Sequence, residues 1–124
     1  MIVLVVKALG FLLFTGRLMR GRGIRELHQA VKNEPVRRPR TLQWSAGDLC
    51  RSIDIACVIY LKSVLCLQRS AATTILLRRY GFHAQLVIGA RVTPFKSHAW
   101  VEIDQRVVND KPYTQELYLE LERC

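Results

Sequence analysis

The sequence lacks the features of several common protein classes. It has no internal repeat and no low-complexity segment, and its four cysteines are spread over 124 residues, mostly within apolar stretches. Neither a zinc-type spacing of Cys and His nor a glycine-rich RNA-binding signature is present. These absences exclude a disulfide-stapled secreted domain and favour a reducing, cytoplasmic location.

Acidic residues are scarce, since 10 Asp and Glu stand against 19 Lys and Arg, which gives a formal charge of +9. Residues 1–40 carry nine basic and two acidic side chains, whereas residues 41–124 carry ten and eight. Such a basic arm fits an acidic partner (nucleic acid, anionic lipid or acidic peptide) and fits a solvated basic surface equally well. Because no nucleic-acid motif accompanies the charge, we expect no nucleic-acid partner.

The N-terminal apolar run covers residues 1–14 and is interrupted by Lys7. A spanning helix needs about 20 apolar residues, and a signal peptide places its charges before the apolar run, whereas Arg17 and Arg20 follow it. We therefore predict no transmembrane segment, but a helix over residues 2–20 that packs against the rest of the fold or a partner subunit.

The remaining pattern predicts helices followed by a small antiparallel sheet, which is an α+β fold. Ser45 and Asp48 are capping residues, Gly81 is a helix stop, and Asp104–Gln105 is a two-residue turn. Residues 114–123 are expected to form a short amphipathic helix or a frayed tail. The expected helices cover residues 24–32 and 45–61, and a further helix begins between residues 63 and 66 and runs to residue 80. The expected strands cover residues 82–90, 97–103 and 106–109.

Cys66 is the cysteine best placed for chemistry. In the first turn of a helix, free backbone N–H groups and the positive end of the dipole stabilise a thiolate, and Arg69 adds to that field. Cys50 and Cys57 instead recur on the apolar face of the preceding helix, as core residues do. Buried free cysteine is common, so Cys66 taken alone is also compatible with a core position.

The predicted hairpin brings a base and an acid together. With the turn at Asp104–Gln105, successive pairs place His98 opposite the region just after Asp110. The carboxylate can then fix the imidazole tautomer, while the other ring nitrogen takes the proton of Cys66. His28 and His83 are expected to be surface or packing residues.

Two further side chains share the strand face of His98. Glu102 is a structural or substrate contact, with the structural role favoured. Trp100 either walls the active site or belongs to the core.

Five blocks of sequence together resemble the transglutaminase-like superfamily, and more narrowly the leader peptidases of bacterial lasso-peptide biosynthesis. They are Cys66–Ser70, Leu76–Gly81, Leu86–Gly89, His98–Glu102 and Val107–Asp110, and the resemblance covers residues 45–112. It implies a transglutaminase-like, papain-like cysteine protease core. It also implies a Cys66, His98 and Asp110 triad that hydrolyses one peptide bond through a thioester, without metal or cofactor. Around it, we expect Trp100 and Arg69 to contact the substrate.

The resemblance further implies a stand-alone form, because 124 residues leave no room for the leader-recognition domain that some members carry. The expected partners are a precursor peptide, a separate leader-recognition protein and the ATP-dependent lasso cyclase. Within one compact domain, residues 1–44 would be a helical, basic docking region and residues 45–124 the catalytic core. Deleting residues 1–40 would then abolish partner-dependent cleavage.

Two other functions remain open at this point. A transglutaminase or amidase would use the same triad with a different acceptor. A basic adaptor that binds peptide, RNA or anionic membrane would carry the triad as a remnant. Thiol reactivity tests the triad, and the salt dependence of nucleic-acid binding tests the adaptor.

Overall fold

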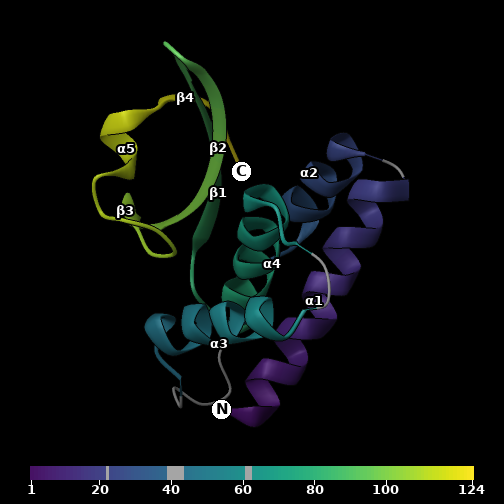
Figure 1. Ribbon diagram of the computed structural model, residues 1–124. Helices are drawn as coiled ribbons and strands as arrows, with labels where there is room; N and C mark the ends of the chain where they lie inside the picture. Colours follow the sequence, from purple (N-terminus) through teal and green to yellow (C-terminus); the bar gives the residue numbers. More distant parts are fainter. Residues whose placement is uncertain (22, 39–43, 61–62) are drawn as a thin grey trace.

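The computed structural model describes residues 1–21, 23–38, 44–60 and 63–124. Four helices come first and a four-stranded antiparallel sheet follows, so the predicted α+β class is confirmed. The helices are α1 (Ile2–Gly21), α2 (Ile24–Asn33), α3 (Ala46–Ile59) and α4 (Cys66–Arg79). Figure 1 shows α4 at the centre, with the sheet on one side of it and α1 and α2 on the other.

Local sequence signals fix the start of α3 and the end of α4. The Ser45 hydroxyl accepts the Asp48 N–H at 3.1 Å and the Asp48 carboxylate accepts the Ser45 N–H at 3.2 Å, which forms a capping box. After α4 the chain turns at Gly81, whose φ of 93° lies in the left-handed region that favours glycine. Both ends agree with the prediction from sequence.

The predicted N-terminal helix is also confirmed. One stripe of α1, formed by Leu4, Ala8 and Leu12, is fully buried in a cluster with residues of α3 and α4. By length and composition, α1 is long and apolar enough to cross a membrane, and it alone meets that test among the described residues. Its buried stripe shows that one face belongs to the core of the domain.

The strands are β1 (Ala84–Val92), β2 (Phe95–Ile103), β3 (Arg106–Val107) and β4 (Leu119–Arg123), in the sheet order β3-β2-β1-β4. Ile103 pairs with Arg106 across Asp104 and Gln105, as predicted. The third strand is shorter than expected because the side chain of Asn109, rather than a backbone carbonyl, accepts the N–H of Val101 at 2.8 Å.

The prediction for the C-terminal segment is wrong beyond residue 117. A single helical turn, α5 (Thr114–Leu117), is followed by β4, which pairs antiparallel with β1. The backbone of Cys124 continues this pairing through two hydrogen bonds with Leu86, at 2.8 and 2.9 Å. The physical reason is that the outer edge of β1 offers unpaired backbone groups, and the alternation of Leu and Glu over residues 119–122 suits a strand.

The N-terminal helices share their core with the rest of the chain. Leu27 and Val31 of α2 are fully buried against Ala71 and Ile75 of α4 and Leu86 of β1. The division at residue 44 therefore stays a prediction about roles, since the two parts are packed together. Deleting residues 1–40 would expose this core, so surface substitutions test docking more cleanly than the deletion does.

The β2–β3 turn offers a test of local strain. Asp104 and Gln105 have φ of 51° and 65°, a conformation that two-residue hairpins reserve for Asn-Gly or Asp-Gly. Gln105→Gly should raise the free energy of unfolding by about 0.5–1 kcal/mol, because a side chain with positive φ carries a steric cost. Urea denaturation measures this free energy. A less stable variant would show that contacts of the Gln105 side chain stabilise the fold by more than its positive φ destabilises it.

Candidate active site

Cys66 is the first residue of α4, the helix that the rest of the fold surrounds. No side chain caps this end of the helix, and the first intrahelical bond runs from the Arg69 N–H to the Leu65 carbonyl at 2.9 Å. The N–H groups of the first turn therefore have no partner within the helix. Cys66 is exposed at this end of the helix.

The other cysteines are less suited to react. Burial, helped by the charge of Asp54, raises the pKa of Cys50 from 9.0 to about 11. Burial also raises the pKa of Cys57 and of Cys124. Cys66 thus differs from all three in its exposure at a helix N-terminus.

This difference predicts selective alkylation. Iodoacetamide at neutral pH should modify Cys66 before Cys50, Cys57 or Cys124, because the thiolate is the reactive species and burial disfavours it at those positions. Peptide mapping by mass spectrometry measures the order, with Cys66→Ser as the control that should lose the fast label. Labelling of Cys57 at the same rate as Cys66 would contradict the prediction.

His98 on β2 and Asp110, beyond β3, are joined as the hairpin prediction required. Nε2 of His98 lies 2.6 Å from Oδ2 of Asp110, and both side chains are largely buried, with 20% and 25% exposure. Burial works to raise the pKa of Asp110, but hydrogen bonds from His98 and from the Lys111 N–H, with the charges of His98 and Arg69, hold that pKa below its usual value. Asp110 is therefore a carboxylate at neutral pH, and Nδ1 is the imidazole nitrogen left for a second partner.

A buried hydrogen-bond network joins the helix of Cys66 to the strand of His98. Ser70, one turn after Cys66 on the same side of α4, donates its hydroxyl to the carbonyl of Ala99 at 3.0 Å. The Asn109 amide donates to the Ser70 hydroxyl at 3.0 Å, and its oxygen accepts the Val101 N–H. The residues beside His98 and Asp110 are thus bonded to the first turns of α4.

Arg69, expected to contact substrate, has structural partners. Its guanidinium lies 2.6 Å from the Asp54 carboxylate of α3 and 2.9 Å from the Asn109 carbonyl. It holds the loop before Asp110 against α3 and α4. Its contact with substrate stays a prediction.

Two aromatic rings flank the imidazole. The ring of Tyr118 stacks on the His98 imidazole with centroids 5.1 Å apart. The indole of Trp100 also stacks on His98, with centroids 6.0 Å apart. Trp100 is 1% exposed, so it is a core residue that also contacts the candidate base. Tyr118 was not predicted from sequence as part of the site. The signal that could have indicated it is its position directly before the alternating residues that form β4.

Glu102 has the structural role that the sequence favours. Its carboxylate is buried, accepts the Trp100 indole N–H at 2.7 Å and pairs with Arg123 at 2.9 Å. Burial works to raise the pKa of Glu102, but hydrogen bonds from Trp100, Gln115 and Arg123 lower it on balance. The bond to Glu102 fixes the plane of the indole beside His98.

Gly89 makes room for this indole. A Cβ at Gly89 would lie 2.7 Å from Cη2 of Trp100 and 3.0 Å from the carbonyl oxygen of Leu119. Gly89→Ala should therefore lower the free energy of unfolding by about 1–3 kcal/mol, since either the ring or β4 must move. Gly10→Ala, where nothing lies within 4 Å, is the control that should not destabilise, and equal stability of both variants in urea denaturation would contradict the argument.

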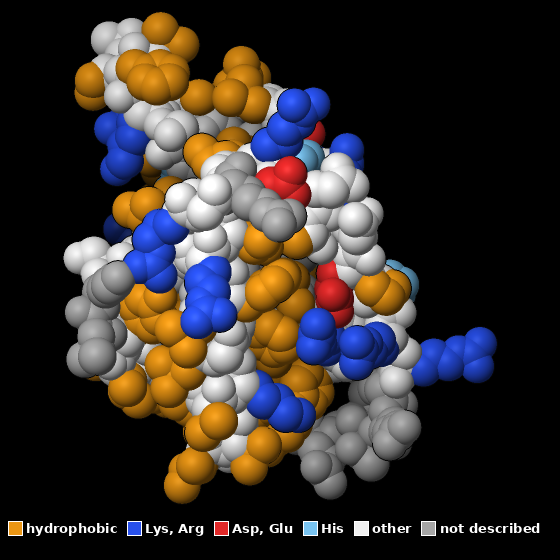
Figure 2. All heavy atoms as spheres, turned by 90° about the vertical axis from the view of Figure 1, so that its right-hand side faces the viewer, with side chains coloured by type: hydrophobic (Ala, Val, Ile, Leu, Met, Phe, Trp, Pro, Cys, Tyr) orange, Lys and Arg blue, Asp and Glu red, His pale blue; other side chains and the backbone are white. Residues whose placement is uncertain are grey.

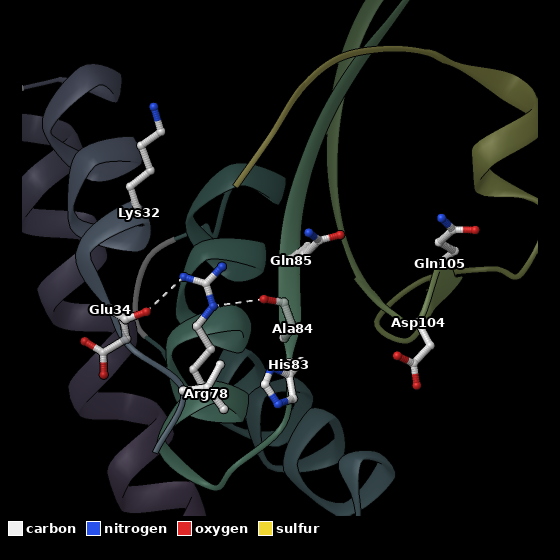
Figure 3. A pocket seen from close by; sticks show the side chains of 9 residues that line it. Lys32, Glu34, Arg78, His83, Ala84, Gln85, Asp104 and Gln105 are labelled. Carbon is white, nitrogen blue, oxygen red and sulfur yellow. Dashed lines mark hydrogen bonds between the residues drawn. The ribbon is translucent and has the colours of Figure 1, made fainter. Parts of the chain in front are cut away.

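A hollow in the surface lies at the other end of α4. It has a volume of about 700 Å³ and is lined by residues that include Lys32, His83 and Arg78 (Figure 3). Arg78 donates to the carbonyls of Ala84 at 2.9 Å and Glu34 at 3.1 Å, so it ties the end of α2 to β1. Because Arg78 is 12 residues after Cys66, this hollow is about 18 Å along the helix from the thiol.

The α+β core thus carries an exposed cysteine at the start of its central helix and a bonded histidine–aspartate pair on the adjoining hairpin. In the parts of the chain that the structure describes, no group of His, Cys, Asp and Glu is suited to hold a metal ion. The chain belongs to the transglutaminase-like superfamily, whose family model matches residues 5–123.

One curated relative is the microcin J25-processing protein McjB of Escherichia coli. It is 47% identical over 47 residues, which are 38% of this chain and 23% of the relative. The chain thus matches less than a quarter of that protein's length. No solved structure matches significantly.

Proposed function

We propose that this protein is a cysteine peptidase that removes the leader from a lasso-peptide precursor. The observation that carries the proposal is the 2.6 Å His98–Asp110 pair, bonded through its neighbours to the helix that begins with an exposed Cys66. Membership of the transglutaminase-like superfamily and the similarity to a microcin-processing protein support the proposed substrate class.

In the proposed reaction, Nδ1 of His98 takes the thiol proton of Cys66, and the thiolate attacks the carbonyl carbon of the scissile bond. His98 then gives that proton to the departing core amine, which leaves the leader bound as a thioester. A water molecule, deprotonated by His98, hydrolyses the thioester and restores the thiol. Asp110 holds the imidazole tautomer throughout.

The proposed partners follow from the resemblance. A separate leader-recognition protein would present the precursor, and an ATP-dependent cyclase would consume the freed amine by joining it to an acidic side chain. Substrate selection would then reside largely in the partner. All of these proteins would act in the cytoplasm.

The test is mass spectrometry of a candidate precursor incubated with this protein and the leader-recognition protein. We expect a single cut at the leader–core junction that is absent with Cys66→Ala. An added primary amine that becomes attached to the leader, in place of free leader acid, would show acyl transfer. No cut together with an unreactive Cys66 would favour the adaptor.

A further inference from the structure

The outer side of α1 carries an exposed apolar stripe. Ile2, Val3, Val6, Leu13 and Phe14 are between 47% and 82% exposed, and helical spacing puts them opposite the buried stripe of Leu4, Ala8 and Leu12. Figure 2, a view from the side of α1, shows hydrophobic side chains gathered on this face of the molecule. A contiguous exposed apolar patch of this kind is typical of an interaction surface.

Cationic side chains adjoin this stripe. Arg17 follows it at the same helical spacing, and Lys7 and Arg20 flank it, while no acidic residue occurs anywhere in α1. Lys and Arg lie among the hydrophobic groups of the visible face, where acidic side chains are few (Figure 2). The surface therefore fits a partner that is apolar inside and anionic at its boundary.

The inner side of α1 is packed against the domain, so the helix would lie along such a partner instead of passing through it. Besides the buried stripe, the Gln68 amide of α4 donates to the Leu12 carbonyl at 2.9 Å, and a Cβ at Gly16 would meet Gln68 Nε2 at 2.8 Å. This close fit would be lost if α1 left the domain. Held flat, the helix is about 30 Å long, and its apolar stripe from Ile2 to Phe14 covers about 18 Å of that length.

We propose that α1 is an interfacial membrane helix, whose outer stripe enters the boundary between headgroups and acyl chains of an anionic lipid bilayer. Arg17 and Arg20 bind lipid phosphates at its C-terminal end, and the charge of +9 adds a general attraction. A second copy of this chain fits less well, because it brings the same charge. A protein partner also fits less well, because the stripe offers neither Tyr nor Trp and has few hydrogen-bonding groups.

The test is co-sedimentation of the full chain with lipid vesicles. We expect binding to vesicles of phosphatidylglycerol and phosphatidylcholine in equal parts, weaker binding to phosphatidylcholine alone, and release at high salt. Val6→Glu combined with Leu13→Glu should lower the partition coefficient roughly tenfold or more, since each change replaces an exposed aliphatic side chain that the bilayer would bury with a charged one. Leu121→Glu, at an exposed leucine of β4 on the other side of α4, is the matched control and should bind like the wild type.

Circular dichroism shows whether each variant is folded, and light scattering gives the mass of the wild type in solution. Absence of binding to the anionic vesicles would overturn the proposal, as would equal binding by the folded stripe variant. A wild-type dimer that the stripe variant converts to a monomer would assign the surface to a second copy instead. Cleavage activity takes no part in these outcomes, so the proposed function can fail or hold independently.

Discussion

Cys66→Ala should abolish leader cleavage, with a loss of roughly 10⁶-fold in kcat, because in the proposed mechanism the thioester forms on Cys66 alone. His98→Ala should be nearly as severe, since the thiol then lacks its base and the core amine lacks its proton donor. Single-turnover cleavage followed by mass spectrometry measures both, and the wild type should also show a covalent leader adduct on Cys66.

Cys57→Ala is the matched control for this experiment. It makes the same chemical change on α3, at a half-buried thiol whose pKa burial raises. It should cleave at the wild-type rate, with at most a modest loss of stability. Persistent cleavage by Cys66→Ala would remove the thiol from the mechanism, whereas loss in both variants would indicate damage to the helical core.

Local features of the chain were predictable from sequence. The capping pair Ser45 and Asp48, the stop at Gly81 and the turn at Asp104–Gln105 each depend on residues within a few positions of one another. The hairpin register then followed from the turn. That register was enough to pair His98 with Asp110, because the two residues are only 12 apart.

Contacts between distant segments were not predictable in this way. The Ser70–Asn109 bond joins residues 39 apart, and no periodicity marks either one as a partner of the other. Tyr118 reaches His98 only because β4 pairs with the far edge of β1, which sets the path of the chain before it. The alternation over residues 119–122 was visible, but so short a segment is compatible with a helix or a tail.

The exposed stripe of α1 could be seen only in the structure. From sequence, residues 2–20 are apolar enough to be covered on every side, and burial by the fold or a partner was the natural expectation. The structure covers one stripe and leaves the opposite one open. Which faces of a helix are buried and which are exposed depends on the positions of the neighbouring elements, and composition does not specify these.

Asp110→Asn should leave the fold intact and lower the cleavage rate by roughly 10⁴-fold, if tautomer control follows the pattern of serine proteases. The amide preserves the shape of the carboxylate. If its NH₂ group faces Nε2 of His98, it donates a hydrogen bond to that nitrogen and so favours the wrong tautomer of the imidazole. Asp104→Asn is the matched control, because it makes the same change at the exposed turn of the same hairpin and should retain activity. The measurement is the single-turnover rate, and equal rates for Asp110→Asn and the wild type would remove Asp110 from the site.

Stability against pH gives this variant a second, independent readout. The pKa of Asp110 is lowered in the folded protein, so its carboxylate stabilises the native state at pH values above its unfolded value of about 3.9. That contribution is lost as the pH falls through the lower, folded value. Urea denaturation should therefore find the wild type more stable than Asp110→Asn near neutral pH, with the difference closing in acid. A difference that is the same at both pH values would mean that the His98–Asp110 contact does not depend on the charge of the carboxylate, and the proposed role of Asp110 in orienting the imidazole would then rest on the rate alone.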